Sequence, residues 1–367
     1  MSGSTLGNYF RISTWGESHG KGIGVVVDGC PAGLPITEEL IQTYLDRRKP
    51  GTTRYSTPRQ ESDSVEILSG IFEGRTTGTP ISMVVRNQTQ RSSDYSEIAG
   101  YYRPGHADYT FDEKYGFRDY RGGGRSSGRE TIGRVAAGAI ACAILNSLNI
   151  EVTAFTKSIG PITIDANKYK KENILISPLG MPDLDASLKA EEYLENQMKA
   201  LDSAGGVIEC MVTGMPAGIG EPVFDKLDAN LAKAVMSIGA VKGFEIGSGM
   251  QAAQSTGSEH NDNFYYTKEN EVNKSTNHAG GILGGISDGS NIILRAFFKP
   301  TPSILKTQNT ISKSGDNIKI QVKGRHDPII VPRAVVVVES MVALTLVDLL
   351  FANMASKMDN LIKFYKN

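Results

Sequence analysis

Thiol side chains are scarce in this sequence. Its 367 residues include only three cysteines, Cys30, Cys142 and Cys210, which lie far apart and are odd in number. This usage argues against a disulfide framework and a thiolate zinc site, and it fits a reducing compartment. The N-terminus also lacks the charged and then apolar pattern of a secretory signal. We therefore expect a cytoplasmic protein.

Long apolar runs and metal motifs are also missing. No apolar run is expected to reach the roughly 20 residues that span a bilayer. The sequence has no His-Glu-x-x-His motif, no cysteine pair at ligand spacing and no aspartate-rich loop. A formal net charge of −1 gives no general attraction to nucleic acid or acidic membranes. We expect no metal, no nucleic acid and no membrane as partners.

Arginine is distributed unevenly. Of the 17 arginines, 14 lie between Arg11 and Arg134, and none lies between Arg134 and Arg295. The guanidinium group is permanently charged and matches the geometry of phosphate and carboxylate. Surface solubility is the alternative, but lysine would serve it equally well and dominates elsewhere. The distribution favours an anion site built mainly from the first third of the chain.

Apolar patterns of both periods run through the chain. Short apolar runs bounded by Gly or Pro predict strands, and apolar residues at helical spacing predict helices. The strands are expected at Gly24–Val27, Val65–Ile71, Ile81–Val85, Val207–Val212, Ile292–Phe298 and Val335–Val338. The helices are expected at Glu38–Arg48, Thr131–Leu148, Leu188–Leu201, Leu227–Met236 and Met341–Phe364. Without a clear linker, we expect one α/β or α+β domain over residues 1–367.

A weak internal repeat is present. Each of two strands is followed by Pro-Ala-Gly and then by a helix, at residues 31–33 and 216–218. Similar short pairs recur in the same order, at separations of 185 to 200 residues: Arg103-Pro104 with Lys299-Pro300, Gly124-Arg125 with Gly324-Arg325, and Arg134 with Arg333. Two interpretations of these pairs are open. They can arise by chance, or they can reflect a pseudo-twofold duplication with halves of about 7–150 and 205–355.

Two of the five histidines lie in glycine-containing turns. His19 belongs to Gly16-Glu17-Ser18-His19-Gly20, and His106 belongs to Arg103-Pro104-Gly105-His106-Ala107-Asp108. An unperturbed histidine pKa near 6.5 suits proton transfer at neutral pH. Two such turns are compatible with two separate proton-transfer roles, while the alternative is a pair of structural histidines.

A glycine–arginine loop, residues 121–129, precedes the small-residue helix that begins at Thr131. It has four glycines and three arginines in nine residues. Glycines let backbone N–H groups face a ligand, and the helix N-terminus adds positive potential. The loop is neither a Walker A motif nor a Gly-x-Gly-x-x-Gly motif. A flexible loop is the alternative, but the composition favours anion binding.

Three further motifs are compatible with two interpretations: each contacts a ligand, or each has a structural role only. They are the glycine-rich run at 277–289, the run Lys299-Pro300-Thr301-Pro302-Ser303, and the run Lys323-Gly324-Arg325-His326-Asp327-Pro328.

These motifs, in this order and over nearly the whole chain, resemble chorismate synthase. The resemblance implies an α+β fold of β-α-β sandwich type, with helices layered around two sheets, and a homotetramer. It implies a lyase that converts 5-enolpyruvylshikimate 3-phosphate to chorismate and phosphate by 1,4-anti elimination. Reduced FMN (FMNH2) is required, with no net redox change. The arginine-rich composition fits such anionic ligands.

The resemblance also implies roles for individual residues. His19 would protonate the departing phosphate, and His106 would hydrogen-bond the reduced flavin. Asp327, with Ser18 and Ser127, would support proton removal. The flavin-binding positions would be Arg125, Ser126, Ser127, Gly239, Ala240, Gly284, Lys299, Pro300, Thr301, Pro302, Ser303 and Arg325. Arg48 and Arg54 match the substrate or NADP end of the site, and we add Arg134 and Arg333 as substrate anion ligands.

The source of electrons is a separate question. Members of the family that reduce their own flavin with NADPH are typically longer, and this chain shows no obvious inserted segment or Gly-x-Gly-x-x-Gly. We expect a separate flavin reductase. Two other classes remain as alternatives. A flavin oxidoreductase would transfer hydride to its substrate, and a phosphate-binding module would leave both histidine turns without a purpose.

Overall fold

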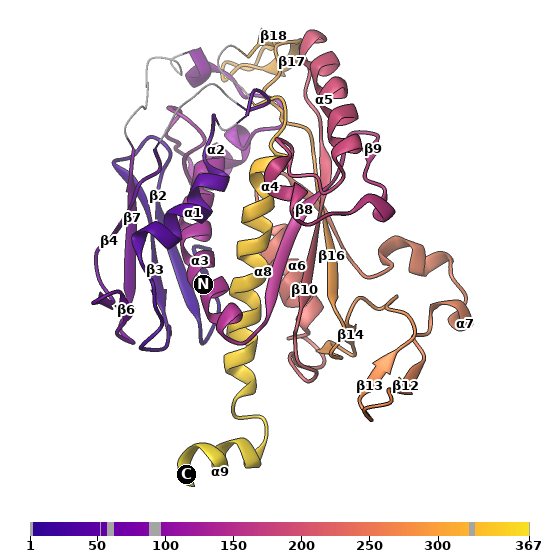
Figure 1. The fold of residues 1–367 in the computed structure, drawn as a ribbon. Coiled ribbons are helices and arrows are strands. Elements are labelled where there is room, and N and C mark those ends of the chain that lie inside the picture. The colour runs from indigo at the N-terminus through magenta and orange to yellow at the C-terminus, as the bar shows by residue number, and fades with distance from the viewer. Residues whose placement is uncertain (1–2, 52, 57–61, 88–96, 323–326, 367) are drawn as a thin grey trace.

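A computed structural model describes residues 3–51, 53–56, 62–87, 97–322 and 327–366. Two five-stranded antiparallel sheets flank a layer of helices (Figure 1). The first sheet has the order β1-β2-β3-β7-β4, with β1 Thr5–Leu6, β2 Arg11–Gly16, β3 Gly22–Asp28, β7 Ile81–Arg86 and β4 Val65–Ile67. The second has the order β11-β16-β10-β8-β9, with β11 Val241–Ile246, β16 Ile292–Phe298, β10 Gly206–Thr213, β8 Glu151–Ile159 and β9 Ile162–Thr163. The α+β class expected from the sequence is confirmed.

Four helices lie between the sheets: α1 Glu38–Arg48, α3 Thr131–Ser147, α6 Leu227–Met236 and α8 Val331–Asn353. α3 packs on β2, β3 and β7 and also on α8, which packs on β8, β10 and α6. The small residues of α3 permit this close approach. A Cβ added to Gly138 would lie 2.2 Å from Cβ of Ser340, and one added to Gly133 would lie 3.1 Å from the carbonyl O of Gly24.

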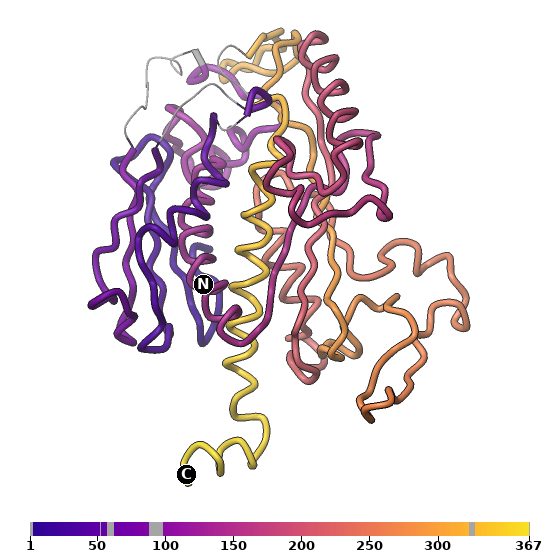
Figure 2. Tube along the Cα trace, viewed as in Figure 1, coloured from indigo at the N-terminus to yellow at the C-terminus, as the bar shows by residue number. Residues whose placement is uncertain are grey.

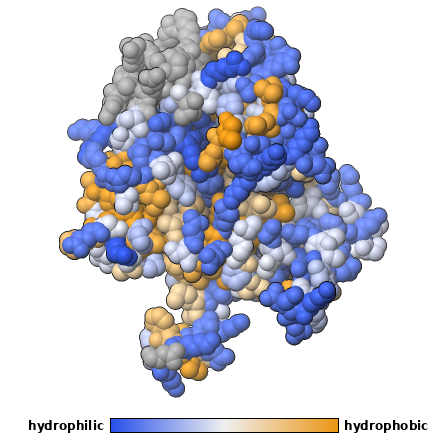
Figure 3. Space-filling view, in the orientation of Figure 1, coloured by the Kyte–Doolittle hydropathy of each residue, from blue (hydrophilic) through white to orange (hydrophobic). Residues whose placement is uncertain are grey.

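The remaining elements lie outside this layered body (Figure 2). They are α2 Asp108–Tyr115, α4 Asn173–Ile176, α5 Leu184–Lys199, α7 Gly257–His260, α9 Met358–Lys366, and the hairpin strands β5 Ile71–Phe72, β6 Arg75–Thr76, β12 Phe264–Tyr266, β13 Val272–Lys274, β14 Ile282–Leu283, β15 Ile286–Ser287, β17 Thr307–Ile311 and β18 Asn317–Gln321. α9 projects from the body (Figure 1) and exposes Met358, Phe364 and Tyr365. Figure 3 shows apolar colouring on this projecting segment.

The strand expected at Val335–Val338 is wrong, because this run belongs to α8. Its valines are buried on every side of the helix between the two sheets, and a helix that is apolar all round shows no single apolar face. By length and composition α8 could span a membrane, contrary to the expectation of no such run, but 83% of its most apolar window is buried inside the protein. The helix expected to run to Phe364 ends at Asn353, and α9 is separate.

The two sheets share a topology. β2, β3, β7 and β4 occupy the same positions in the first sheet as β8, β10, β16 and β11 occupy in the second. The turns after β3 and β10 also match. The Thr76 hydroxyl donates to the carbonyl O of Pro31 at 2.5 Å, and the Ser287 hydroxyl donates to that of Pro216 at 2.6 Å. These correspondences support the predicted duplication, which a superposition of the halves would test.

Candidate active site

The turn that carries His19 connects β2 to β3. Nδ1 of His19 lies 3.0 Å from Oγ of Ser18, whose side chain is buried. Gly122, from the glycine–arginine loop, packs directly against the imidazole, since a Cβ at this position would lie 2.3 Å from Nδ1. The loop therefore reaches the histidine only because residue 122 has no side chain.

The glycine–arginine loop is fastened to the first sheet. Arg125 donates to the Thr14 hydroxyl at 2.7 Å, to the Thr14 carbonyl at 3.1 Å and to the Gly16 carbonyl at 3.3 Å. The hydroxyl of Ser127 accepts a hydrogen bond from the backbone N–H of Arg129 at 3.3 Å, and Ser126 donates to a carbonyl of its own loop at 2.7 Å. Arg125 thus links the glycine–arginine loop by hydrogen bonds to β2, the strand that leads into the His19 turn.

A buried carboxylate joins two arginines behind this loop. Asp63 lies 2.5 Å from Nη2 of Arg48 and 3.0 Å from Nη1 of Arg129. Burial alone would raise the pKa of Asp63, but the two guanidinium groups outweigh it and hold the pKa below its usual range. Burial lowers the pKa of Arg48 to about 10, so it stays charged at neutral pH. Arg48 as a whole residue is only 1% exposed.

Two more predicted arginines lie at this end of the helical layer. Arg333, in the first turn of α8, donates to Asp327 at 2.7 Å and to the backbone carbonyl of Arg48 at 3.1 Å. Arg134 donates to Glu130 at 2.7 Å and to the Ser237 hydroxyl at 2.6 Å. Arg48 also lies 3.5 Å from Oγ1 of Thr131, the first residue of α3. Both α3 and α8 begin beside Arg48, and their N-termini add positive potential there.

His106 lies in the second turn, which is held by ion pairs. Arg103 makes two contacts of 2.8 Å with Asp108. Nδ1 of His106 is 3.0 Å from the carbonyl O of Pro104, which only accepts, so Nδ1 carries the proton. Nε2 then accepts from the Ser303 hydroxyl at 2.9 Å. Burial, with nearby Arg103, lowers the pKa of His106 to about 4, so the ring is neutral at physiological pH.

The Lys299–Ser303 segment lies against the His106 turn. Nζ of Lys299 donates to the carbonyl O of Gly105 at 2.8 Å, and Pro302 packs on the same glycine. The backbone N–H of Lys299 donates to the carbonyl O of Ala240 at 3.0 Å, which brings the Gly239–Ala240 pair to the same place; Pro300 follows next in the chain. Among the described residues, Oγ1 of Thr301 is buried without a hydrogen-bond partner. An anionic ligand could satisfy this hydroxyl.

Two predicted positions fall elsewhere, and a third is not described by the structure. Gly284 lies in the β14–β15 hairpin, which packs beside the start of β16, whereas Lys299 follows its end. β16 has seven residues, so its two ends are about 20 Å apart. Gly284 and Lys299 therefore lie at opposite ends of this strand. Arg54 is 65% exposed and pairs with Glu195 at 2.5 Å. Arg325 lies outside the described residues.

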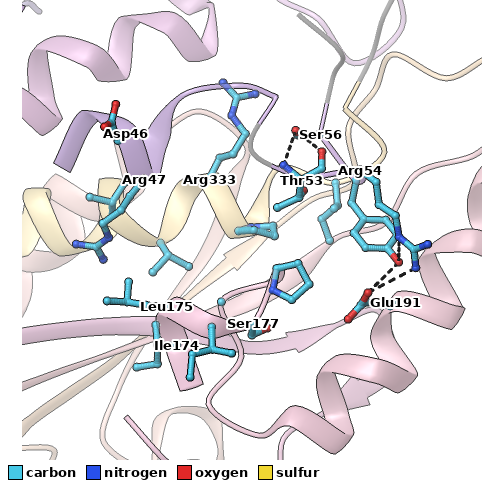
Figure 4. Close-up of a pocket in the computed structure, with 18 residues that line it drawn as sticks. Asp46, Arg47, Thr53, Arg54, Ser56, Ile174, Leu175, Ser177, Glu191 and Arg333 are labelled. Atoms are coloured by element: carbon cyan, nitrogen blue, oxygen red, sulfur yellow. Dashed lines mark hydrogen bonds and ion pairs between the residues drawn. The ribbon is translucent and has the colours of Figure 1, made fainter. Parts of the chain in front are cut away.

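A cavity of about 610 Å³ lies between α4, α5 and the start of α8 (Figure 4). Arg47, Arg54 and Arg333 line it together with apolar side chains such as Leu175. Neither His19 nor His106 is among its lining residues. Sequence reasoning missed Asp63 and Asn87, the two residues that join the arginines to the His19 turn, because neither belongs to a recognisable local motif.

The fold and the site define an α+β protein with two glycine-containing histidine turns and a cluster of buried arginines. Among the described residues, no group of side chains could hold a metal ion. Comparison with known proteins narrows this class. The family model described as chorismate synthase matches residues 10–351. The chorismate synthase of Lachnoclostridium phytofermentans is 70% identical over 366 residues and covers 100% of both chains. That of Methanosarcina mazei is 55% identical and covers 95% of this chain and 96% of its own.

A solved structure titled as the crystal structure of chorismate synthase is also similar. It matches with a TM-score of 0.77 and 30% identity, covering 98% of this chain and 97% of its own. The chain belongs to the chorismate synthase family, as its motifs indicated. It is an enzyme, a chorismate-forming lyase of the shikimate pathway.

Proposed function

We propose that this enzyme converts 5-enolpyruvylshikimate 3-phosphate to chorismate and phosphate by 1,4-anti elimination, with reduced FMN bound and no net redox change. The observation that carries the proposal is the presence in one chain of two differently held histidines and one cluster of buried arginines. His106 is neutral and presents a fixed tautomer, while His19 lies beside the glycine–arginine loop.

The positive charge of the arginine cluster would attract the anionic groups of the substrate. Arg48, Arg129 and Arg333 carry three positive charges against the two carboxylates of Asp63 and Asp327. The N-termini of α3 and α8 reinforce this surplus. A phosphate and two carboxylates would be drawn to this end of the helical layer. Arg48 acts there through its field or after rearrangement, since it is buried. Arg134 would contribute as a hydrogen-bond donor, because Glu130 balances its charge.

The two histidines would have different roles. His19 would give a proton to the departing phosphate, and its neighbour Ser18 would orient the ring through Nδ1. His106 would hydrogen-bond the flavin. Asp327, held by Arg333, would with Ser127 support removal of the ring proton. Reduced FMN supplies the electron density that the elimination requires.

The flavin would lie along the Lys299–Ser303 segment. The buried and unpartnered Oγ1 of Thr301 supports a ligand at this place, and Ala240 and Lys299 are already in contact there. Gly284 lies at the opposite end of β16, and a second copy of the chain would be one way to bring this position to the flavin. We propose the homotetramer that the family resemblance implies, together with a cytoplasmic location and a separate flavin reductase as electron source.

An anaerobic assay with dithionite-reduced FMN tests the reaction. We expect phosphate release equal to substrate consumed, and a flavin absorbance spectrum that is the same before and after turnover. Stoichiometric flavin oxidation would instead support the oxidoreductase alternative. Ligand binding without phosphate release would support the binding-module alternative.

A second assay tests the electron source. The purified protein is given FMN, NADPH and substrate, with no other reductase. We expect neither NADPH oxidation nor chorismate formation until a flavin reductase or dithionite is added. NADPH oxidation that sustains chorismate formation would overturn this part of the proposal and would give the exposed Arg54 a role in nucleotide binding.

A further inference from the structure

We propose that Asn87 is a positioning residue that sets the place of His19, an inference that rests on the proposed acid role of that histidine. Asn87 follows β7 directly and lies at the same end of the first sheet as the β2–β3 connection. Its side chain meets the His19 turn on one side and the buried arginines on the other.

The amide of Asn87 clamps both ends of the turn. Nδ2 donates to the carbonyl O of Glu17 at 2.9 Å and to the carbonyl O of Gly20 at 2.8 Å. Both amide hydrogens are used, one on each side of His19. Within the turn, the Gly20 N–H donates to the Glu17 carbonyl at 3.1 Å. Glycines at residues 16 and 20 leave the backbone of this short turn permissive, so contacts from outside, such as those of Asn87, help to fix its conformation.

The orientation of this amide is itself determined. Oδ1 of Asn87 accepts from Nε of Arg129 at 3.2 Å and from Nη2 at 2.9 Å. A guanidinium group has donors only, so the oxygen must face Arg129 and the nitrogen must face the turn. A flipped amide would oppose its NH2 to those donors and its oxygen to two carbonyl oxygens.

Arg129 is in turn held by Asp63, which it shares with Arg48. Arg48 also donates to the carbonyl O of Gly128 at 3.3 Å. A continuous chain of contacts therefore runs from the arginine cluster through Asp63, Arg129 and Asn87 to the backbone of the His19 turn. Asn87 is its last member and the one that touches the turn.

The experiment compares Asn87→Asp with Asn87→Ser at saturating reduced FMN. Aspartate keeps the shape but loses both donors, and serine shortens the side chain. Because a displacement of about 1 Å can cost about 100-fold in rate, we expect kcat to fall by roughly 10- to 100-fold in both variants, with KM changed less than about 3-fold and FMN affinity unchanged. Asn173→Asp is the matched control, since Asn173 also clamps a backbone carbonyl, that of Pro182 at 3.0 Å.

A spectroscopic readout separates positioning from general destabilisation. Histidine labelled with carbon-13 at Cε1 gives one signal per ring, and His19→Asn assigns the signal of His19. We expect this signal to shift in both Asn87 variants while that of His106 stays in place. Native kcat, an equal loss in the Asn173 control, or a loss of kcat with an unshifted His19 signal would each overturn the proposal. If His19→Asn itself retains native kcat, the proposed acid role fails, and the shift of the His19 signal still decides the positioning.

Discussion

Asn87 and Lys299 occupy corresponding places in the two sheets, and each donates to the turn that carries one histidine. Gly22 pairs with Arg86, the last residue of β7, and Gly206 pairs with Phe298, the last residue of β16. Asn87 and Lys299 are the residues that directly follow these two strands. Nδ2 of Asn87 reaches the His19 turn, and Nζ of Lys299 reaches the His106 turn. A side-chain donor that follows an equivalent strand thus contacts each of the two histidine turns.

The first prediction concerns His106 and pH. Burial, with Arg103 nearby, lowers the pKa of His106 to about 4, against about 6.5 in an unfolded chain. The unfolded chain therefore takes up this proton first as the pH falls. The resulting stability is fully present above pH 6.5 and is lost as the pH falls toward 4. In His106→Gln, the free energy of unfolding in urea should decrease less between pH 7 and pH 5. Equal decreases in both proteins would contradict the assigned pKa.

The second prediction concerns Gly122. In Gly122→Ala the new Cβ would lie 2.3 Å from Nδ1 of His19, so the ring must move. We expect kcat to fall by about 100-fold while the circular dichroism spectrum is retained. Gly257→Ala is the control, because a Cβ there meets nothing within 4 Å. Native kcat in Gly122→Ala would show that the imidazole position is not critical.

The third prediction concerns the stability of the buried ion cluster. Asp63→Asn leaves Arg48 and Arg129 without their shared carboxylate, and uncompensated buried charges cost about 3–5 kcal/mol. Asp28→Asn removes an exposed partner of Arg11 and should cost less than about 1 kcal/mol. Denaturant unfolding measures both variants. Similar losses in the two would show that Asp63 is not needed to neutralise its arginines.

The fourth prediction concerns the contact between α3 and α8. Gly138→Ala would place a Cβ 2.2 Å from Cβ of Ser340, and overpacking of this kind costs about 1–3 kcal/mol. The double variant Gly138→Ala with Ser340→Gly should recover part of the loss, because it removes the Cβ and Oγ that would lie 2.2 and 2.4 Å from the new methyl group and leaves only the Cα, at 2.7 Å. The measurement is the free energy of unfolding of the single and double variants. A double variant less stable than the first single one would contradict steric conflict as the cause.

Local patterns in the sequence predicted much of this fold. The 3.6-residue period of Glu38–Arg48 and the apolar run Ile292–Phe298 correspond to α1 and β16 with the same bounds. The same reasoning placed a strand at Val335–Val338, inside α8. A β-branched run has the same composition in a buried strand and in a helix buried on all sides, so only its surroundings decide between them.

The sequence by itself determined the family and the chemical groups of the site. His19, His106 and the glycine–arginine loop lie in short motifs whose turns and charges can be read locally. Only the tertiary structure decided that Asp63 neutralises Arg48 and Arg129, and that Asn87 clamps the His19 turn. These contacts join residues 15 to 70 positions apart, and they depend on how sheets and helices pack. Ion pairs and side-chain clamps between distant segments leave no periodic trace in the sequence, because a single polar residue after a strand looks the same whether or not a partner faces it.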